Sequence, residues 1–218
     1  MPEILSQRQI DLLELIGKEE SITKAFYLSG GTPLAAFYLH HRYSEDLDFF
    51  SEQEVDVLTL QTFFKKHKTK LEYKNIELQQ SFNRNIFFLE FADETVKIEF
   101  TYFPFPRIKK SEKQYGIDID SLKDIAANKL FTIYQRTKAR DYIDLYCIIK
   151  KEDYTVKELI VLAKAKFESH IDALSLGTKF MKAKEATDMP RLIEKVSNNE
   201  WQSFFEKEAQ KLKKGILD

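Results

Sequence analysis

Apolar residues recur at helical spacing at two places in the first part of the chain. Residues 5–17 carry apolar side chains at this spacing and end at Gly17, which predicts a packed helix with a glycine at its C-terminus. Residues 55–68 repeat the pattern and predict an amphipathic helix. Between them, residues 25–28 form a short apolar and aromatic run, which indicates a buried strand. The first part of the chain therefore combines helices with a strand.

A region of strands follows the second helix. Residues 71–78 alternate loosely, and residues 86–91 and 96–103 form two stronger apolar runs. The acidic residues 93–94 between those two runs predict the turn of a β-hairpin. The sheet is expected to end within residues 102–106, because the prolines there cannot donate a hydrogen bond to a neighbouring strand.

The register of this hairpin singles out one acidic residue. A turn centred on residues 93–94 places Glu90 opposite Lys97, since cross-strand partners sum to a constant. The same register places Phe88 opposite Glu99. Lys97 then has an acidic partner, whereas Glu99 has none. An unpaired carboxylate in an apolar strand suits a metal ligand or a general base, and a solvent-exposed face is the alternative explanation.

Beyond the sheet the chain is predicted to be helical. The polar segment after Pro106 indicates a loop, which divides an αβ core, residues 1–106, from a helical C-terminal region, residues 107–218. Helical spacing resumes at Ser121, where Ser121-x-x-Asp124 resembles a capping box, and continues in further helices. The predicted fold class is therefore α+β, with a mixed sheet flanked by helices and followed by a C-terminal helical region.

A glycine turn follows the first predicted strand. Gly30 and Gly31 end that strand, and Thr32 and Pro33 suit the N-cap and first position of a short helix over residues 34–40. Glycines at this place expose backbone N–H groups beside a helix N-terminus, where hydrogen bonding and the helix dipole both favour phosphate. Sharp strand exits use the same turn, so the glycines alone do not define a phosphate site.

A pair of aspartates follows the glycine turn and the short helix. Residues 45–50 are predicted to form a strand in which Asp46 and Asp48 project from the same face. Two neighbouring carboxylates repel each other unless a cation neutralises them, and a divalent ion with oxygen ligands does so best. An exposed acidic edge is the alternative. Arg42 and Ser44 stand just upstream as candidate phosphate contacts.

A further set of charged residues lies in the helical half. Lys129 falls within the apolar stripe of the helix that begins near Ser121. A buried lysine needs an anionic partner, unless its long side chain reaches the surface. Asp141 has a structural alternative to a role in a site, as the N-cap of a helix over residues 142–149 with Asp144 at the N3 position. Because both lie on one helix face, one can orient Lys129 or Arg140 while the other caps the helix.

The order of these motifs carries a resemblance. Gly30-Gly31-Thr32, followed by Arg42-x-Ser44-x-Asp46-x-Asp48 and later by Lys129 and Arg140-Asp141, resembles the signature of nucleotidyltransferase-fold proteins of the AbiEii/AbiGii toxin type. The family also carries an acidic residue on a later strand, which corresponds to Glu99. The resemblance implies a nucleotidyltransferase-like sheet. It implies nucleotide binding by Ser29, Gly30, Gly31, Thr32, Arg42, Ser44 and Lys129, metal binding by Asp46, Asp48 and Glu99, and catalytic roles for Asp46, Asp48, Glu99, Lys129 and Asp141.

The resemblance also implies a reaction. A Mg²⁺-dependent nucleotidyltransferase, with one or two Mg²⁺ ions, transfers an NMP from an NTP to an acceptor hydroxyl, which is a tRNA 3′ end or a protein hydroxyl. Such a protein is expected to act as the toxin of a toxin–antitoxin pair, with an antitoxin protein as partner. The alternative is a non-catalytic NTP- or metal-binding regulatory module, which needs the same glycines and aspartates.

Composition limits the remaining choices. The chain has 218 residues, of which 43% are hydrophobic and 32% charged, as in a globular protein. A net charge of −1 provides no overall attraction for nucleic acid, so any RNA contact must be local. Cys147 is the single cysteine, which excludes a disulfide framework. No apolar run is long enough to cross a membrane and no secretory signal is evident, so a cytoplasmic location is expected.

Overall fold

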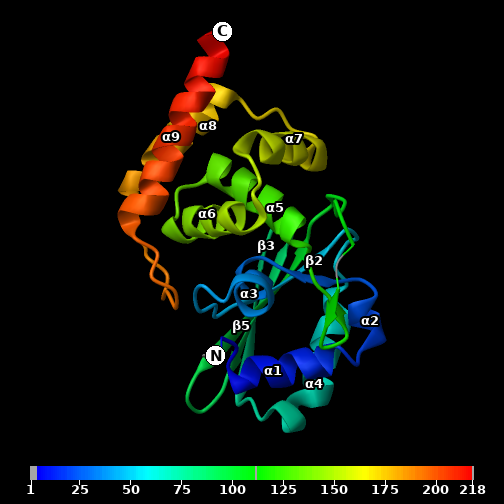
Figure 1. Cartoon of the computed structure of the whole chain (residues 1–218). Coiled ribbons are helices and arrows are strands. Elements are labelled where there is room, and N and C mark those ends of the chain that lie inside the picture. The colour runs from blue at the N-terminus through cyan, green and yellow to red at the C-terminus, as the bar shows by residue number, and fades with distance from the viewer. Residues whose placement is uncertain (1–3, 111, 218) are drawn as a thin grey trace. The chain divides into compact units, whose positions relative to one another are not determined.

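The computed structural model describes residues 4–110 and 112–217, and the chain divides into two compact units (Figure 1). The first unit comprises the chain up to Phe37, with Ser44–Pro106 and Lys110–Ser121; the second comprises Tyr38–Tyr43, Arg107–Lys109 and the chain from Leu122 onward. Over the described residues, no helix is both long enough and apolar enough to span a membrane.

The first unit contains a mixed five-stranded sheet. Its strands are β1 (Tyr27–Ser29), β2 (Leu47–Ser51), β3 (Asn75–Ser81), β4 (Arg84–Glu90) and β5 (Thr95–Tyr102), in the spatial order β1-β2-β5-β4-β3. Strands β2 and β5 run parallel, and the other neighbouring pairs are antiparallel. The short strands β6 (Lys113–Gln114) and β7 (Ile117–Asp118) form a second sheet. The α+β prediction, with a mixed sheet, is confirmed.

Helices of the first unit supply part of its core. These helices are α1 (Gln7–Ile16), α2 (Glu20–Thr23) and α4 (Val57–Leu71). Phe64 of α4 packs against Phe87 of β4, with ring centroids 4.8 Å apart, and Phe49 of β2 stacks on Phe100 of β5 at 5.0 Å. Because side chains alternate along a strand, a β2 face that buries Leu47 and Phe49 directs Asp48 to the opposite face.

The register of the β4–β5 hairpin differs from the prediction by two residues. Lys97 lies opposite Phe88 rather than Glu90, and Glu99 lies opposite Ile86 rather than Phe88. The reason is that the turn is centred one residue earlier than predicted, where a backbone hydrogen bond of 2.8 Å closes it. The shift is even, so each side chain keeps its predicted face of the sheet.

The short helix after the glycine turn also differs from the prediction. The first helical turn, α3, spans Gly31–Pro33 and has Gly30 rather than Thr32 at its N-cap. The chain then continues as a π-helix, η1, over Leu34–Leu39. Gly30 takes this cap because its φ of 77° is a left-handed conformation that glycine adopts without strain. The predicted threonine cap is therefore wrong, since the turn begins earlier.

The second unit is helical. It contains α5 (Leu122–Gln135), α6 (Ala139–Glu152), α7 (Val156–Phe167), α8 (Ala173–Met181), the 3₁₀ turn η2 (Lys182–Glu185) and α9 (Asn198–Leu217). Helices α8 and α9 lie side by side (Figure 1). Trp201 and Phe205 of α9 pack on Tyr142 of α6. These aromatic contacts bring the last helix into the core of the unit.

Helix α6 begins three residues earlier than predicted. Its N-cap is Lys138, so Asp141 lies within the first turn and is not the cap. The Asp141 and Asp144 side chains both turn into the unit and are completely buried. The prediction of Asp141 as N-cap is wrong because cationic side chains, and not the helix N-terminus, engage this carboxylate.

Candidate active site

Strands β2 and β5 bring acidic residues together in the first unit. Asp48 of β2 and Glu99 of β5 are direct partners in the parallel register. Asp46 lies immediately before β2, two residues from Asp48. Parallel strand partners point to the same side of a sheet. The structure therefore places Asp48 and Glu99, two of the predicted metal ligands, side by side. The third, Asp46, lies just before β2.

The glycine turn packs against this acidic group. Ser29, at the end of β1, is the strand partner of Asp48. At Gly30, a Cβ atom would lie 2.9 Å from Asp48 Oδ2, and the φ of 77° is one that residues with a side chain rarely adopt. The glycine therefore lets the turn take this conformation close to the aspartate.

Hydroxyl groups tie the turn to the loop that carries the aspartates. The Thr32 hydroxyl donates to the backbone carbonyl of Asp46 and lies 2.9 Å from the Ser44 hydroxyl. The Ser29 hydroxyl donates to Asp120 Oδ2 at 2.6 Å, and both side chains are buried. Thr32, Ser44 and Ser29 therefore hold the backbone of this site in place.

Two cations that the sequence did not identify as site residues lie against the carboxylates. Arg84 of β4 donates hydrogen bonds from Nε and Nη2 to the two carboxylate oxygens of Glu99, each at 2.6 Å. Lys97 of β5 places Nζ 2.9 Å from Asp46 Oδ2 and 3.7 Å from Glu99 Oε2. Lys97 was recognisable as a same-face neighbour of Glu99, two residues away, whereas Arg84 could be found only from the β4–β5 register. The prediction that Glu99 has no partner is wrong.

The same contacts keep Glu99 ionised. Burial by itself raises the pKa of Glu99. Hydrogen bonds from Arg84 and from the Thr101 hydroxyl, at 2.8 Å, together have a larger effect in the opposite direction, so the pKa of Glu99 lies below its ordinary value. The hydrogen bond to Glu99 in turn raises the pKa of Arg84. Glu99 is therefore an anion in this structure at neutral pH.

The carboxylates fit a divalent cation by their chemistry. Asp and Glu oxygens are the ligands that Mg²⁺ and similar hard cations prefer. Within residues 4–110 and 112–217, no three His, Cys, Asp or Glu side chains are gathered as a ready metal site. In this structure Lys97 and Arg84 engage carboxylate oxygens of Asp46 and Glu99. The ammonium group of Lys97 contacts both Asp46 and Glu99, and it therefore occupies the place of a metal ion bound between these two carboxylates.

A second group of charged residues lies inside the helical unit. Lys129 Nζ is 2.8 Å from Asp141 Oδ1 and 2.7 Å from Asp144 Oδ2. Arg136 Nε also bonds to Asp141, at 2.9 Å. Lys129 is 8% exposed, so of the two interpretations of this lysine, the structure favours the buried, paired one. Asp141 and Asp144 together orient its ammonium group.

Arg42 and His41 join the same group. Arg42 donates from Nε and Nη2 to the two oxygens of Asp144 at 2.7 and 2.8 Å, and His41 Nε2 lies 2.8 Å from Oδ1 of the same carboxylate. Burial raises the pKa of Asp144, but Lys129 and Arg42 outweigh it and hold the pKa well below the ordinary value. This network of Lys129, Arg42, His41, Asp141 and Asp144 attaches residues 38–43 to helix α6.

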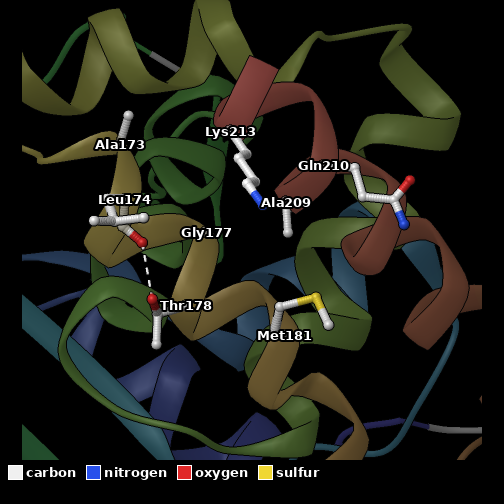
Figure 2. Close-up of a pocket in the computed structure, with 8 residues that line it drawn as sticks. All are labelled: Ala173, Leu174, Gly177, Thr178, Met181, Ala209, Gln210 and Lys213. Carbon is white, nitrogen blue, oxygen red and sulfur yellow. Dashed lines mark hydrogen bonds between the residues drawn. The ribbon is translucent and has the colours of Figure 1, made fainter. Parts of the chain in front are cut away.

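A cavity of about 320 Å³ lies between α8 and α9 (Figure 2). Its lining consists of small, apolar and uncharged polar side chains with one lysine: Ala173, Leu174, Gly177, Thr178, Met181, Ala209, Gln210 and Lys213. Within this set of described residues there is no carboxylate, and none of the sequence-predicted site residues takes part. The cavity therefore lacks the chemistry for a metal or a triphosphate.

Comparison with known proteins agrees with this geometry. The family described as nucleotidyl transferase AbiEii toxin, type IV toxin–antitoxin system, matches residues 17–214. The uncharacterized protein aq_aa25 of Aquifex aeolicus (strain VF5) is 32% identical over 169 residues, which are 76% of this chain and 77% of the relative.

Two crystal structures from Helicobacter pylori share the fold. A candidate nucleotidyltransferase has a TM-score of 0.62 and 19% identity, with 97% of each chain covered. The protein JHP933 has a TM-score of 0.58 and 18% identity, with 96% of this chain and 90% of that chain covered. These similarities extend over both units of the present chain.

The mixed sheet is that of a nucleotidyltransferase. The chain belongs to the AbiEii nucleotidyltransferase toxin family, whose systems pair a toxin with an antitoxin. The resemblance noted in the sequence is thereby confirmed. Enzymes of this class use an NTP and a divalent metal.

Proposed function

We propose that this nucleotidyltransferase moves an NMP from an NTP to an acceptor hydroxyl in a Mg²⁺-dependent reaction. The observation that carries the proposal is the close packing of Gly30 on Asp48, whose strand partner is Glu99. A phosphate-binding turn and carboxylates are thus joined in one small region of the first unit. Without that proximity, one triphosphate could not contact both.

Most of the predicted site residues of the first unit have a proposed role in this reaction. The backbone N–H groups at Gly30 and Gly31 bind phosphate oxygens, and the Thr32 hydroxyl holds the turn to the loop of Asp46. Asp46, Asp48 and Glu99 hold one or two Mg²⁺ ions. Such an ion, when bound, polarises the α-phosphate and neutralises charge on the departing pyrophosphate.

Glu99 is better suited to binding or positioning than to proton transfer. Burial raises the pKa of Glu99, but hydrogen bonds from Arg84 and Thr101 outweigh that effect and lower the pKa. A general base works best with a pKa near the operating pH, whereas a metal ligand has to be ionised. We therefore assign Glu99 to the cation site rather than to deprotonation of the acceptor.

The predicted roles of the second unit stay predictions. The family resemblance implies that Lys129 and Arg42 contact phosphate and that Asp141 takes part in catalysis. In this structure Lys129 is held by Asp141 and Asp144, and Arg42 is held by Asp144.

Incorporation of labelled nucleotide tests the proposal. The protein is incubated with Mg²⁺, each α-labelled NTP, and either bulk tRNA or a protein extract as acceptor, which also distinguishes the two acceptor classes. We expect label in one acceptor class, and we expect Asp48→Asn to reduce incorporation at least about 100-fold, because a lost metal ligand removes charge stabilisation from the transition state. The matched control is Asp93→Asn, in the exposed β4–β5 turn, which should retain wild-type incorporation. Tight NTP binding without incorporation into any acceptor would instead support the regulatory module.

A further inference from the structure

Lys97 occupies an unusual place among the acidic residues of the first unit. It lies on β5, two residues before Glu99 and therefore on the same face of the strand. Its Nζ contacts Asp46 Oδ2 at 2.9 Å and Glu99 Oε2 at 3.7 Å. One ammonium group thus bridges two carboxylates from different parts of the chain, as a bound metal ion does.

Arg84 differs from Lys97 in its contacts. The guanidinium of Arg84 makes a two-pronged contact with Glu99, a geometry in which planar donors match one carboxylate. Lys97 is a point charge on a flexible stem, with a side chain 26% exposed, and its main contact, Asp46, is 34% exposed. Arg84 can therefore remain on Glu99 while Lys97 moves, since the lysine needs only a rotation of its stem to leave.

A divalent cation at Asp46 and the Lys97 ammonium cannot share these oxygens at short distance. Both are positive, and their repulsion at contact would oppose metal binding. Removing the lysine charge should consequently make the site more receptive to a metal.

We propose that Lys97 is an internal counter-ion that competes with the divalent metal for Asp46 and Glu99. The inference rests on the proposed function, because it requires a metal at these carboxylates. Lys97 then sets the metal concentration at which the site fills, and it neutralises the acidic residues while no metal is bound. It is a positioning residue of the site, not a group that reacts with the nucleotide.

Equilibrium binding of Mn²⁺ to the full-length protein, without nucleotide, tests this inference. Mn²⁺ serves as the probe because its free and bound forms are distinguished by electron paramagnetic resonance. Lys97→Met, which keeps the length of the side chain and removes its charge, should bind Mn²⁺ about fivefold more tightly than the wild type, the factor that corresponds to a partly exposed ion pair. Lys97→Arg, which keeps the charge, should retain the wild-type affinity.

Three controls make the result specific. Lys113→Met removes another ion-paired lysine of the first unit, one that lies 3.5 Å from Asp118, and should leave Mn²⁺ affinity unchanged. Asp46→Asn should abolish the gain in Lys97→Met, because the competed ligand is gone. Lys97→Gln, also neutral, replaces Lys97→Met if circular dichroism shows that the methionine variant is not folded.

The possible results separate the two proposals. Equal or weaker Mn²⁺ binding by the neutral Lys97 variants, with clear binding by the wild type, overturns the counter-ion inference and leaves the metal site intact. If neither the wild type nor the neutral variants bind Mn²⁺, the metal site of the proposed function is wrong, and the inference is overturned with it. Tighter Mn²⁺ binding by the neutral Lys97 variants, with unchanged binding by Lys97→Arg and Lys113→Met, supports both the metal site and the counter-ion inference.

Discussion

The two units of the molecule each hold carboxylates against cations, but in different surroundings. In the helical unit, Asp141 and Asp144 are completely buried and Lys129 is 8% exposed. In the sheet unit, the Asp46 side chain is 34% exposed and that of Arg84 is 51% exposed. Buried ion pairs depend on each partner, because an unpaired charge in the interior is costly, whereas exposed pairs contribute little to stability. We therefore expect the buried network of the helical unit to be structural, and the more exposed contacts of the sheet unit to be the ones that exchange for a ligand, as proposed above.

The largest effect is expected from Asp144→Asn. The substitution keeps the shape of the side chain but leaves Arg42 and Lys129 without their shared carboxylate. We expect a loss of about 3–5 kcal/mol in the free energy of unfolding, the range for breaking a buried ion pair. Urea denaturation measures it. The matched control is Asp153→Asn, at the exposed end of α6; an equally small change in both variants would refute the structural role of the network.

The pH dependence of that loss should follow the pKa of Asp144. Because the pKa of Asp144 is held well below its ordinary value of 3.8, chiefly by Lys129 and Arg42 against the effect of burial, its charge stabilises the fold at every pH above about 4. As the pH falls below that value, the unfolded chain takes up the proton first, and the contribution decreases. The stability difference between wild type and Asp144→Asn should therefore be constant from pH 7 to about pH 5 and shrink in stronger acid. Denaturation curves at several pH values test this, and a difference that persists unchanged at pH 3 would contradict it.

Gly30→Ala should have an intermediate effect on stability and a clear effect on function. The backbone at Gly30 has φ of 77°, and the added Cβ would meet Asp48 Oδ2 at 2.9 Å. We expect a loss of about 1–3 kcal/mol from backbone strain, together with reduced nucleotide incorporation. Gly177→Ala in α8 is the control, since its Cβ would meet no atom closer than 3.8 Å and its φ is not positive. Wild-type incorporation by Gly30→Ala would show that the turn does not serve the reaction.

The smallest effect on stability is expected from Arg84→Gln. The Arg84 side chain is half exposed, and the buried Glu99 carboxylate keeps its contacts with Thr101 and Lys97 when Arg84 is replaced, so the loss in the free energy of unfolding should be about 1 kcal/mol. Nucleotide incorporation should nevertheless fall, because Glu99 loses the group that orients it. A stability loss as large as that of Asp144→Asn would remove the contrast between the two units.

Local patterns in the sequence predicted much of the fold. Helical spacing located α1 and α4 to within a few residues, and the capping box of Ser6 and Gln9 explains why α1 begins where it does. Strand alternation correctly placed Asp48 on the face opposite the one that buries Leu47 and Phe49. These features depend on residues close together along the chain, so they are readable without the tertiary structure.

Long-range pairings were less accessible. Arg42 and Asp144 are 102 positions apart in the sequence, and no periodicity links them. The partner of Glu99 was missed because only the directly opposite residue was considered. Arg84 is the register partner of Thr101 and reaches Glu99 along the diagonal between the two strands.

The sequence by itself determined the order of the glycine turn and the acidic residues, the alternation of the strands and membership of the family, because each depends on residue types at short, regular spacings. Only the tertiary structure decided that Gly30 lies against Asp48, that Asp48 and Glu99 are neighbours, and that Lys97 and Arg84 neutralise the carboxylates. The physical reason is that strand pairing joins distant segments, and the register of that pairing sets which charges meet.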